Sequence, residues 1–352
     1  MNIEFTGHAG FILNVKNSVY LMDPWFSRKG AFASSWFQFP SNHHYGKHQF
    51  KNLNSVFISH EHLDHYDKDY LGSIAESTPL CIPGFPSAIF KNKIKKDLKR
   101  NPKILSIHKI HKFNGFDLKI LFEESPMNQD SIWVFRSNNF SIVNTVDSRL
   151  NEEQVEEILD FTRGSPDVLM LQFSGASWYP ACYDDVDKNE SKIKLDNKLT
   201  YGLKIAQLFN PKFLVANAGP PIFLDEDLKD INNEISFINP GLVKEHLKSM
   251  GYKNKILAPM PNDVLNLDDN SYHRRYPFRN EFSWTDNNNY IKKYRQNQND
   301  LIMIEKDKFG QIKSKKNLFE LFKNHFYDLF KLNNYFNKKI NSRILFKVNG
   351  ND

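Results

Sequence analysis

The sequence has few cysteines, no long apolar run and no leader-like beginning. Only two of its 352 residues, Cys81 and Cys182, are cysteines, so a disulfide framework is not expected. No run of 18 apolar residues occurs, so no transmembrane helix is expected. The first residues lack the basic and apolar segments of a secretory signal. Together these absences favour a cytoplasmic protein that does not contact a membrane.

The charge is modest and spread along the chain. Lysine and arginine number 47 against 41 acidic residues, which gives a net charge of +6. The most basic run, residues 91–100, carries Ile94 and Leu98 at helical spacing, which is typical of a solvated helix face rather than a nucleic-acid surface. Forty per cent of the residues are hydrophobic, so the chain can build a substantial core and a nucleic-acid partner is not expected.

The most informative stretch is Ser-His-Glu-His-Leu-Asp-His at residues 59–65. It directly follows Ser-Val-Phe-Ile, an apolar run typical of a buried strand. His60 and His62 are two residues apart, so an extended backbone points both imidazoles the same way. Asp64 and His65 follow on the turn and can face a second point. The alternative is a solvated histidine-rich loop, but the pattern favours two neighbouring metal sites for zinc, iron or manganese.

This pattern resembles the signature of the metallo-β-lactamase superfamily, whose members fold as an αββα sandwich with a dinuclear metal site at one edge. Further segments resemble, in order, one branch of that superfamily, which contains CMP-N-acetylneuraminate hydroxylase and its bacterial relatives. They are residues 7–10, 21–26, 31–32 with 35–36, 130–131, 144–147, 173–177 and 218–219. The resemblance covers about residues 1–260.

The resemblance implies an α/β chain (four layers, α+β in connectivity) with a catalytic domain over residues 1–285. We expect a small C-terminal extension over residues 286–352, with an amphipathic helix at 316–339 and a strand at 343–348. Polar runs after residue 265, among them Asp268-Asp269-Asn270, predict a linker before it. In the catalytic domain, apolar periodicity predicts strands and helices. Strands are expected within 2–22 and at 55–59, 79–82, 104–109, 117–123, 131–137, 140–145, 168–171 and 213–215, and helices at 67–76, 86–98, 151–163, 191–209 and 240–250.

The resemblance also implies a third ligand for the metal bound by His60 and His62. Hydrolytic members of the superfamily supply a histidine there. In this sequence the only histidines between the motif and residue 147 are His108 and His111, which come too early. The segment where the ligand belongs offers carboxylates instead. Asp130 is the first choice because it opens an apolar strand, and Glu123 and Glu124 are the alternatives.

The remaining ligands implied by the resemblance are a bridging carboxylate and a last ligand beside Asp64 and His65. Asp147 follows an apolar strand and fits the bridge. The expected strand at 213–218 ends without a histidine, so Asp225 is the nearest candidate for the last ligand, ahead of His246 and His273. Two further residues are expected to orient ligands through hydrogen bonds, His8 on the first turn and Asp23 after the next strand.

Two functions remain open. Carboxylates in place of histidines make the site harder and favour two iron ions over zinc, with manganese as another alternative. The first function is an oxygenase acting on a polar small metabolite. Because the sequence has no paired Cys-x-His motif for a Rieske cluster, its electrons would come from a separate ferredoxin or Rieske protein. The second is a hydrolase of thioesters, lactones, amides or phosphodiesters that uses a metal-bound hydroxide. Asp64 and His65 are the catalytic candidates in both.

The substrate pocket is expected between two aromatic segments, residues 30–45 and 173–183. A loop as long as the one over residues 25–52 is usually functional. The residues expected to contact the substrate are Arg28, Trp36, Trp178 and Tyr179.

Overall fold

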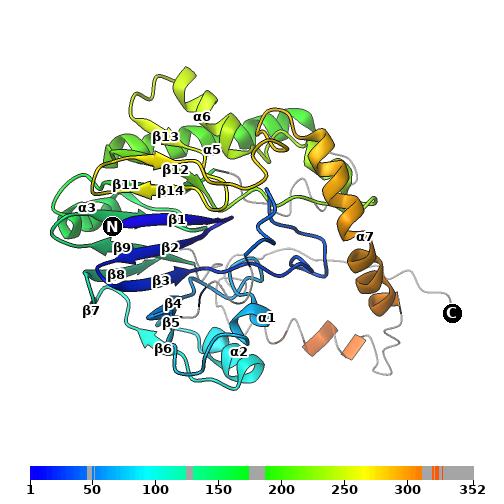
Figure 1. Ribbon diagram of the computed structural model, residues 1–352, viewed down its shortest axis with the longest axis horizontal. Helices are drawn as coiled ribbons and strands as arrows, with labels where there is room; N and C mark the ends of the chain where they lie inside the picture. The colour runs from blue at the N-terminus through cyan, green and yellow to red at the C-terminus, as the bar shows by residue number, and fades with distance from the viewer. Residues whose placement is uncertain are drawn as a thin grey trace.

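The computed structural model describes residues 1–45, 50, 52–123, 130–173, 187–310, 319–320, 322–324 and 327. Its strands form two sheets packed face to face (Figure 1). The first sheet has the spatial order β15 (Tyr272–His273), β14 (Val264–Asn266), β1 (Asn2–Gly7), β2 (Gly10–Val15), β3 (Ser18–Met22), β4 (Ser55–Phe57), β5 (Leu80–Pro83) and β6 (Lys103–Leu105). The second has the order β13 (Lys255–Leu257), β12 (Phe213–Asn217), β11 (Val168–Gln172), β10 (Ser141–Asn144), β9 (Ser131–Arg136), β8 (Phe116–Phe122) and β7 (Ile110–Phe113).

Helices cover the two outer faces of this sandwich. Helices α1 (Lys68–Leu71) and α2 (Ile89–Leu98) pack on the first sheet, and α3 (Glu152–Thr162), α5 (Lys188–Phe209) and α6 (Pro240–Ser249) pack on the second (Figure 1). This arrangement confirms the predicted four-layer αββα sandwich. The remaining helices with described bounds are a short 3₁₀ helix, η1 (Lys229–Asn233), and helix α7 (Asn288–Gly310), and the described residues 319–320, 322–324 and 327 are also helical. None of the helices in the described part of the chain has the length and apolar character needed to cross a bilayer.

Period-two alternation explains why the sheets can be covered on both faces. In β11, Val168 and Met170 face the core between the sheets, whereas Leu169 and Leu171 face the helices. The two sheets meet through aromatic rings, such as that of Phe57, which lies 5.3 Å from the ring of Trp133. Burying one such side chain contributes roughly 1.5–3 kcal/mol, so the inter-sheet core fixes the relative position of the sheets.

The strand directions bring several strand ends to one edge. Strand β3 runs parallel to β4, and β10, β11 and β12 run parallel to one another. Strand β1 is antiparallel to β2, and β2 to β3, so the end of β1 reaches the same edge as the end of β3. The residues that follow β1, β3, β4 and β10 include His8, Asp23, His60 and Asp147, and this topology gathers them.

The C-terminal part differs from the prediction. Strands β13, β14 and β15 and helix α7 were not predicted, and the segment expected to be a polar linker contains β15 and the buried Tyr276 and Phe282. Helix α7 packs through Tyr294 and Ile302 against Phe37 and residues after β12. The predicted helix at 316–339 and strand at 343–348 lie largely outside the described residues, and the domain boundary at 285 stays a prediction.

One buried side chain fixes the loop after β3 against helix α1. Asp67 accepts hydrogen bonds from the backbone N–H groups of Phe26, Ser27 and Tyr70, at 2.9, 2.7 and 3.1 Å. It is the N-cap of α1 and only 4% exposed. The same carboxylate therefore begins the helix and anchors the loop that crosses the metal-binding edge.

We expect Asp67→Ala to lower the free energy of unfolding by about 2 kcal/mol or more, because three backbone N–H groups, two of them buried, lose their acceptor. The matched control is Asp69→Ala, which removes an exposed carboxylate paired with Lys29 and should cost less than about 0.5 kcal/mol. Urea denaturation of both variants measures the difference. Equal losses in the two variants would show that Asp67 has no anchoring role.

Candidate metal centre

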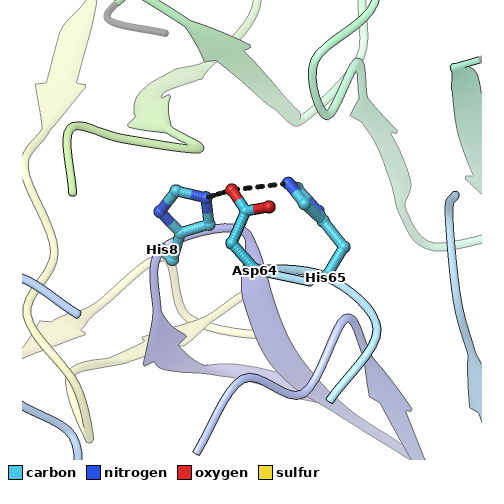
Figure 2. A group of neighbouring side chains, drawn as sticks. All are labelled: His8, Asp64 and His65. Atoms are coloured by element: carbon cyan, nitrogen blue, oxygen red, sulfur yellow. Dashed lines mark hydrogen bonds and ion pairs between the residues drawn. The ribbon is translucent and has the colours of Figure 1, made fainter. Parts of the chain in front are cut away.

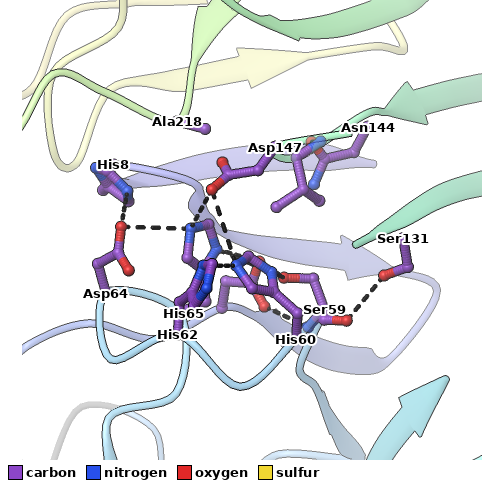
Figure 3. A network of polar contacts seen from close by, with 12 residues as sticks. His8, Ser59, His60, His62, Asp64, His65, Ser131, Asn144, Asp147 and Ala218 are labelled. Atoms are coloured by element: carbon purple, nitrogen blue, oxygen red, sulfur yellow. Dashed lines mark hydrogen bonds and ion pairs between the residues drawn. The ribbon is translucent and has the colours of Figure 1, made fainter. Parts of the chain in front are cut away.

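The first group of candidate ligands surrounds Nε2 of His60. This atom lies 2.9 Å from Nδ1 of His62 and 3.8 Å from Oδ2 of Asp147 (Figure 3). It also lies 3.6 Å from Oδ1 of Asp130. His60 is 1% exposed, whereas His62 lies at the surface. The two histidines thus converge, as the spacing of the motif predicted, and Asp130 joins them from the start of β9.

The second group is His8, Asp64 and His65. Oδ2 of Asp64 lies 2.9 Å from Nε2 of His8 and 3.5 Å from Nε2 of His65 (Figure 2). The three ligand atoms lie within 4.8 Å of one another, which is close enough for a single metal ion. His8 was expected only to orient a ligand. His8 lies on the tight Gly-His-Ala-Gly turn with a φ of 52°, and its approach to Asp64 depends on the topology of the sheets and not on a local sequence pattern.

Asp147 stands between the two groups. Its Oδ2 lies 3.8 Å from Nε2 of His60 and 3.5 Å from Nε2 of His65 (Figure 3). Its other oxygen accepts a 2.7 Å hydrogen bond from the Gln172 side chain at the end of β11, so the carboxylate is held with one oxygen facing both groups. This is the position that a bridging carboxylate requires.

Hydrogen bonds on the far side of each ring determine which histidine nitrogen is left for a metal. The Ser59 hydroxyl donates its hydrogen to Asp23 at 2.6 Å. Its oxygen therefore accepts a hydrogen bond from Nδ1 of His60 at 2.9 Å, which leaves a free lone pair on Nε2 of His60. Nδ1 of His65 lies 3.0 Å from Asp23 and donates to it. Asp23 is buried and contacts the ring of His65 directly and that of His60 through Ser59; its role in orienting ligands stays a prediction. Metal-binding histidines in proteins have such partners.

A further observation supports the fit of these donor atoms to metal ions. Nε2 of His65 is buried and lies 3.5 Å from Oδ2 of Asp64 and 3.5 Å from Oδ2 of Asp147, so this atom faces the carboxylates of both groups. Burial by itself lowers the pKa of His65, but the charges of Asp147 and Asp64 outweigh burial and raise it well above its ordinary value. In the metal-free chain a proton on His65 thus supplies part of the positive charge that the carboxylates favour.

Asp130 is buried beside other acids. Burial, together with the charge of Asp147, raises the pKa of Asp130 to about 8. Glu123 lies nearby in the sequence, but its side chain accepts from the backbone N–H of Arg149, and Glu124 lies outside the described residues. Asp130 is therefore the carboxylate that the structure brings to His60, and its assignment as a ligand stays a prediction.

The other candidates have different surroundings. Asp225 forms a 2.7 Å ion pair with Lys306 of α7 and belongs to neither group. His108 pairs with Glu157, and His111 contacts the carbonyl of Ser106. His246 lies in α6 and His273 in β15. Where Asp225 was expected as the last ligand, the residue that the structure brings to Asp64 and His65 is His8.

The expected substrate-contacting residues are spread out. Trp36 packs on Phe32, with ring centroids 4.7 Å apart, and Phe32 lies 6.5 Å from the His62 ring, so this aromatic pair forms a wall beside the first group. Arg28 lines a different pocket, against α7. Trp178 and Tyr179 lie outside the described residues. Sequence reasoning missed Ser59 and Gln172, whose roles depend on contacts across the fold.

Comparison with known proteins identifies the family of this chain. The family model described as "Beta-lactamase superfamily domain" matches residues 2–190. A protein from Mycolicibacterium smegmatis, provisionally named a Rieske 2Fe–2S iron–sulfur protein, is 27% identical over 253 residues, 66% of this chain and 46% of the relative. This chain therefore spans about half the length of the curated relatives that it matches.

Solved structures share the fold at low identity. A protein described as a possible metal-dependent hydrolase from Veillonella parvula aligns with a TM-score of 0.53 and 14% identity, over 75% of this chain and 98% of its own. CmlA from Streptomyces venezuelae, described as a diiron β-hydroxylase, aligns with a TM-score of 0.49 and 11% identity, over 73% of this chain and 52% of its own.

We expect His62→Ala to hold about one metal ion per chain where the unaltered chain holds two, because it removes a ligand from one group only. Asp147→Asn should weaken the binding of both ions, because the Asp147 carboxylate faces both groups. The control is His111→Ala, which removes a histidine outside the cluster and should change nothing. Metal is counted by elemental analysis after dialysis. Two tightly held ions in His62→Ala would refute the assignment.

Asp130 should make the metal-free chain less stable as the pH rises. Its pKa is about 8 in the folded chain, against an ordinary value of 3.8, so the folded form keeps a proton that the unfolded form releases between about pH 4 and 8. Stability must then fall with rising pH across that window. We expect Asp130→Asn to gain stability relative to the unaltered chain between pH 5 and pH 8, measured by urea denaturation with a chelator. Asp69→Asn, at an exposed site, should show no such gain.

Proposed function

The chain belongs to the β-lactamase superfamily, as its resemblance implied, and from this premise we propose that it is an oxygenase with two iron ions. Membership and the metallo-β-lactamase fold indicate a metal-dependent enzyme, either a hydrolase or a hydroxylase. The observation that carries the finer proposal is Asp130. A carboxylate lies beside His60 and His62 where hydrolytic members of the superfamily supply a histidine.

The donor atoms support iron on chemical grounds. Asp64, Asp130 and Asp147 supply carboxylate oxygens beside the imidazole nitrogens of His60, His62, His65 and His8. Carboxylate oxygens are harder ligands than imidazole nitrogens, and a carboxylate-rich set favours iron or manganese over zinc. Two iron ions held here would supply the activation of dioxygen that hydroxylation of a polar metabolite needs.

The protein's own residues would orient the reactants and handle protons. Asp64 is held between His8 and His65. Burial tends to raise the pKa of Asp64, but the charge of His65 and the hydrogen bond from His8 lower it, so Asp64 remains ionised and can accept a hydrogen bond from a substrate. Phe32 lies beside the ring of His62 and packs on Trp36, so this aromatic pair offers an apolar wall to the substrate.

An oxygenase of this kind needs electrons from outside the described site. The name of the mycobacterial relative includes a Rieske 2Fe–2S cluster, which requires two Cys-x-His pairs. The present sequence has two cysteines, and neither is followed by a histidine two positions later. We propose a Rieske protein or a ferredoxin as the electron donor, in keeping with the name of that relative.

A hydrolase is the second candidate, and the position of Asp64 favours it. A buried, ionised carboxylate next to two histidines can hold and deprotonate an attacking water, and paired metal ions activate water and polarise carbonyl or phosphoryl groups. Thioesters, lactones, amides and phosphodiesters are the corresponding substrates.

The experiment is metal analysis of protein purified without oxygen, followed by oxygen consumption with a chemical reductant. We expect about two iron ions per chain and reductant-dependent oxygen uptake. Asp130→His supplies the imidazole of the hydrolytic pattern and should shift binding toward zinc and reduce oxygen uptake at least about tenfold. Asp69→His, at an exposed position, is the control. Equal turnover with zinc, without oxygen and without reductant, would replace the oxygenase by the hydrolase.

A further inference from the structure

A basic groove, with a volume of about 720 Å³, lies where the two sheets end. Its lining comes from helix α6, from β13 at the end of the second sheet, from β15 at the end of the first sheet, and from residues between 274 and 285. None of these residues belongs to either candidate metal group. The volume lies within the range of small-molecule sites in proteins, about 300–1,000 Å³, so the charge of the walls indicates which kind of molecule would bind.

Positive side chains dominate the lining of the basic groove. They are Lys244, Lys248, Lys253, Lys255, Arg274 and Arg279. Arg279 is already bound to the buried Asp263, at 2.6 and 2.8 Å. The others form no ion pair within the described part of the chain, and Glu245 is the one acid among the described residues of the lining. The groove therefore has an excess of positive charge.

The positive charges converge on Lys244, which is half-buried in α6. Burial and the charges of Lys248 and Arg274 lower the pKa of Lys244. Lys255 acts in the same direction, and Glu245 acts against it. Lys248 belongs to the next turn of α6, Lys255 to β13, and Arg274 to the segment after β15. Like charges from three parts of the fold thus repel one another across one groove, and an anion with several charges would relieve this repulsion.

One wall of the groove is held in place by the half-buried Trp284. Its indole Nε1 donates to the carbonyl of Ala258 at 3.2 Å, and its ring lies 5.0 Å from that of Phe282. A Cβ on Gly241 would clash with Trp284, so the glycine allows α6 to approach the indole closely. The groove is therefore formed before a ligand arrives, which lowers the entropy cost of binding.

The excess of charge selects among anions. A carboxylate or a single phosphate can contact only part of the positive lining, whereas each further phosphate group adds negative charge and strong acceptor oxygens. Lys248, Lys255 and Arg274 are exposed, so such oxygens can reach them. A nucleic acid tracks cations along an extended surface, but here the cations gather around a concave site of small-molecule size.

We propose that the basic groove binds an oligophosphate, a chain of two or three linked phosphate groups that is either free or attached to an organic group. The phosphate oxygens contact Lys244, Lys248 and Arg274, and Trp284 offers an apolar surface to the rest of the molecule. This site is separate from the metal centre and does not depend on the reaction that the metals support.

The test is calorimetry of the full chain with tripolyphosphate, ATP and orthophosphate. We expect tripolyphosphate to bind at least about tenfold more tightly than orthophosphate, and its affinity to fall as salt is added, because exposed ion pairs are screened. ATP distinguishes the two sources of the phosphate chain. Tighter binding of ATP would identify an organic oligophosphate that also contacts Trp284, and ATP that binds no tighter would identify free oligophosphate.

Variants test whether the basic groove is the site. Lys244→Gln and Arg274→Gln should each weaken tripolyphosphate binding about fivefold, because each removes one charge from the groove. The matched control is Arg275→Gln, which alters the next residue, an exposed cation outside the lining, and should change binding less than twofold.

A variant that gains affinity excludes a folding defect as the explanation. Glu245→Gln removes the acid from the lining and should strengthen binding about threefold, because its charge repels the phosphates. Asp286→Asn, at an exposed position outside the lining, should change binding less than twofold. Because oligophosphates also bind metal ions, His62→Ala tests the metal centre and should bind tripolyphosphate as the unaltered chain does.

Several results would overturn the proposal. It fails if neither tripolyphosphate nor ATP binds, if Arg275→Gln weakens binding as much as Arg274→Gln, if Glu245→Gln brings no gain, or if His62→Ala loses binding. Equal affinity for orthophosphate would make the groove a site for any small anion. Tighter binding of a thymidine oligonucleotide, with the same dependence on Lys244 and Arg274, would make it a nucleic-acid surface instead.

Discussion

The buried carboxylate of Asp23 holds the metal-binding turn to the sandwich. It accepts from the backbone N–H and the hydroxyl of Ser59, and it lies 3.0 Å from Nδ1 of His65. The carbonyl of Ser59 in turn accepts from Ser131, whose hydroxyl accepts from the indole of Trp133. This chain of bonds runs from the end of β3, in one sheet, to β9 in the other. The histidines of the candidate metal centre therefore keep their orientation only while the two sheets keep their relative position.

Much of the fold was predictable where the sequence repeats a pattern over several residues. The alternation in β1, β2 and β3 and the capped apolar stripe of α3 predict their structures locally. Strands β13, β14 and β15 contain two or three residues each, too few for any periodicity to emerge. Helix α7 is rich in asparagine and lysine, and only its few buried residues, such as Tyr294 and Ile302, mark the face that packs.

The candidate site shows the same contrast between residues that a local pattern predicts and residues that only the fold brings together. His60, His62, Asp64 and His65 are neighbours in the chain, so their spacing alone indicated that they meet. Asp130 was predicted as a metal ligand because it opens a strand, which is again a local feature. The companion of Asp64 and His65 depends on which strand ends share an edge. His8 comes from the first turn and Asp225 from a segment that pairs with α7, and no local pattern could rank these two distant residues.

The buried carboxylates also keep protons bound at the metal-free centre. At pH 7, Asp130, whose pKa is about 8, and His65, whose pKa is raised by the neighbouring carboxylates, both hold a proton. Metal ions bind the deprotonated forms, so loading the centre expels protons into the solvent. The heat of loading must then depend on the ionisation enthalpy of the buffer, and acidification of the surroundings must favour release of the metals.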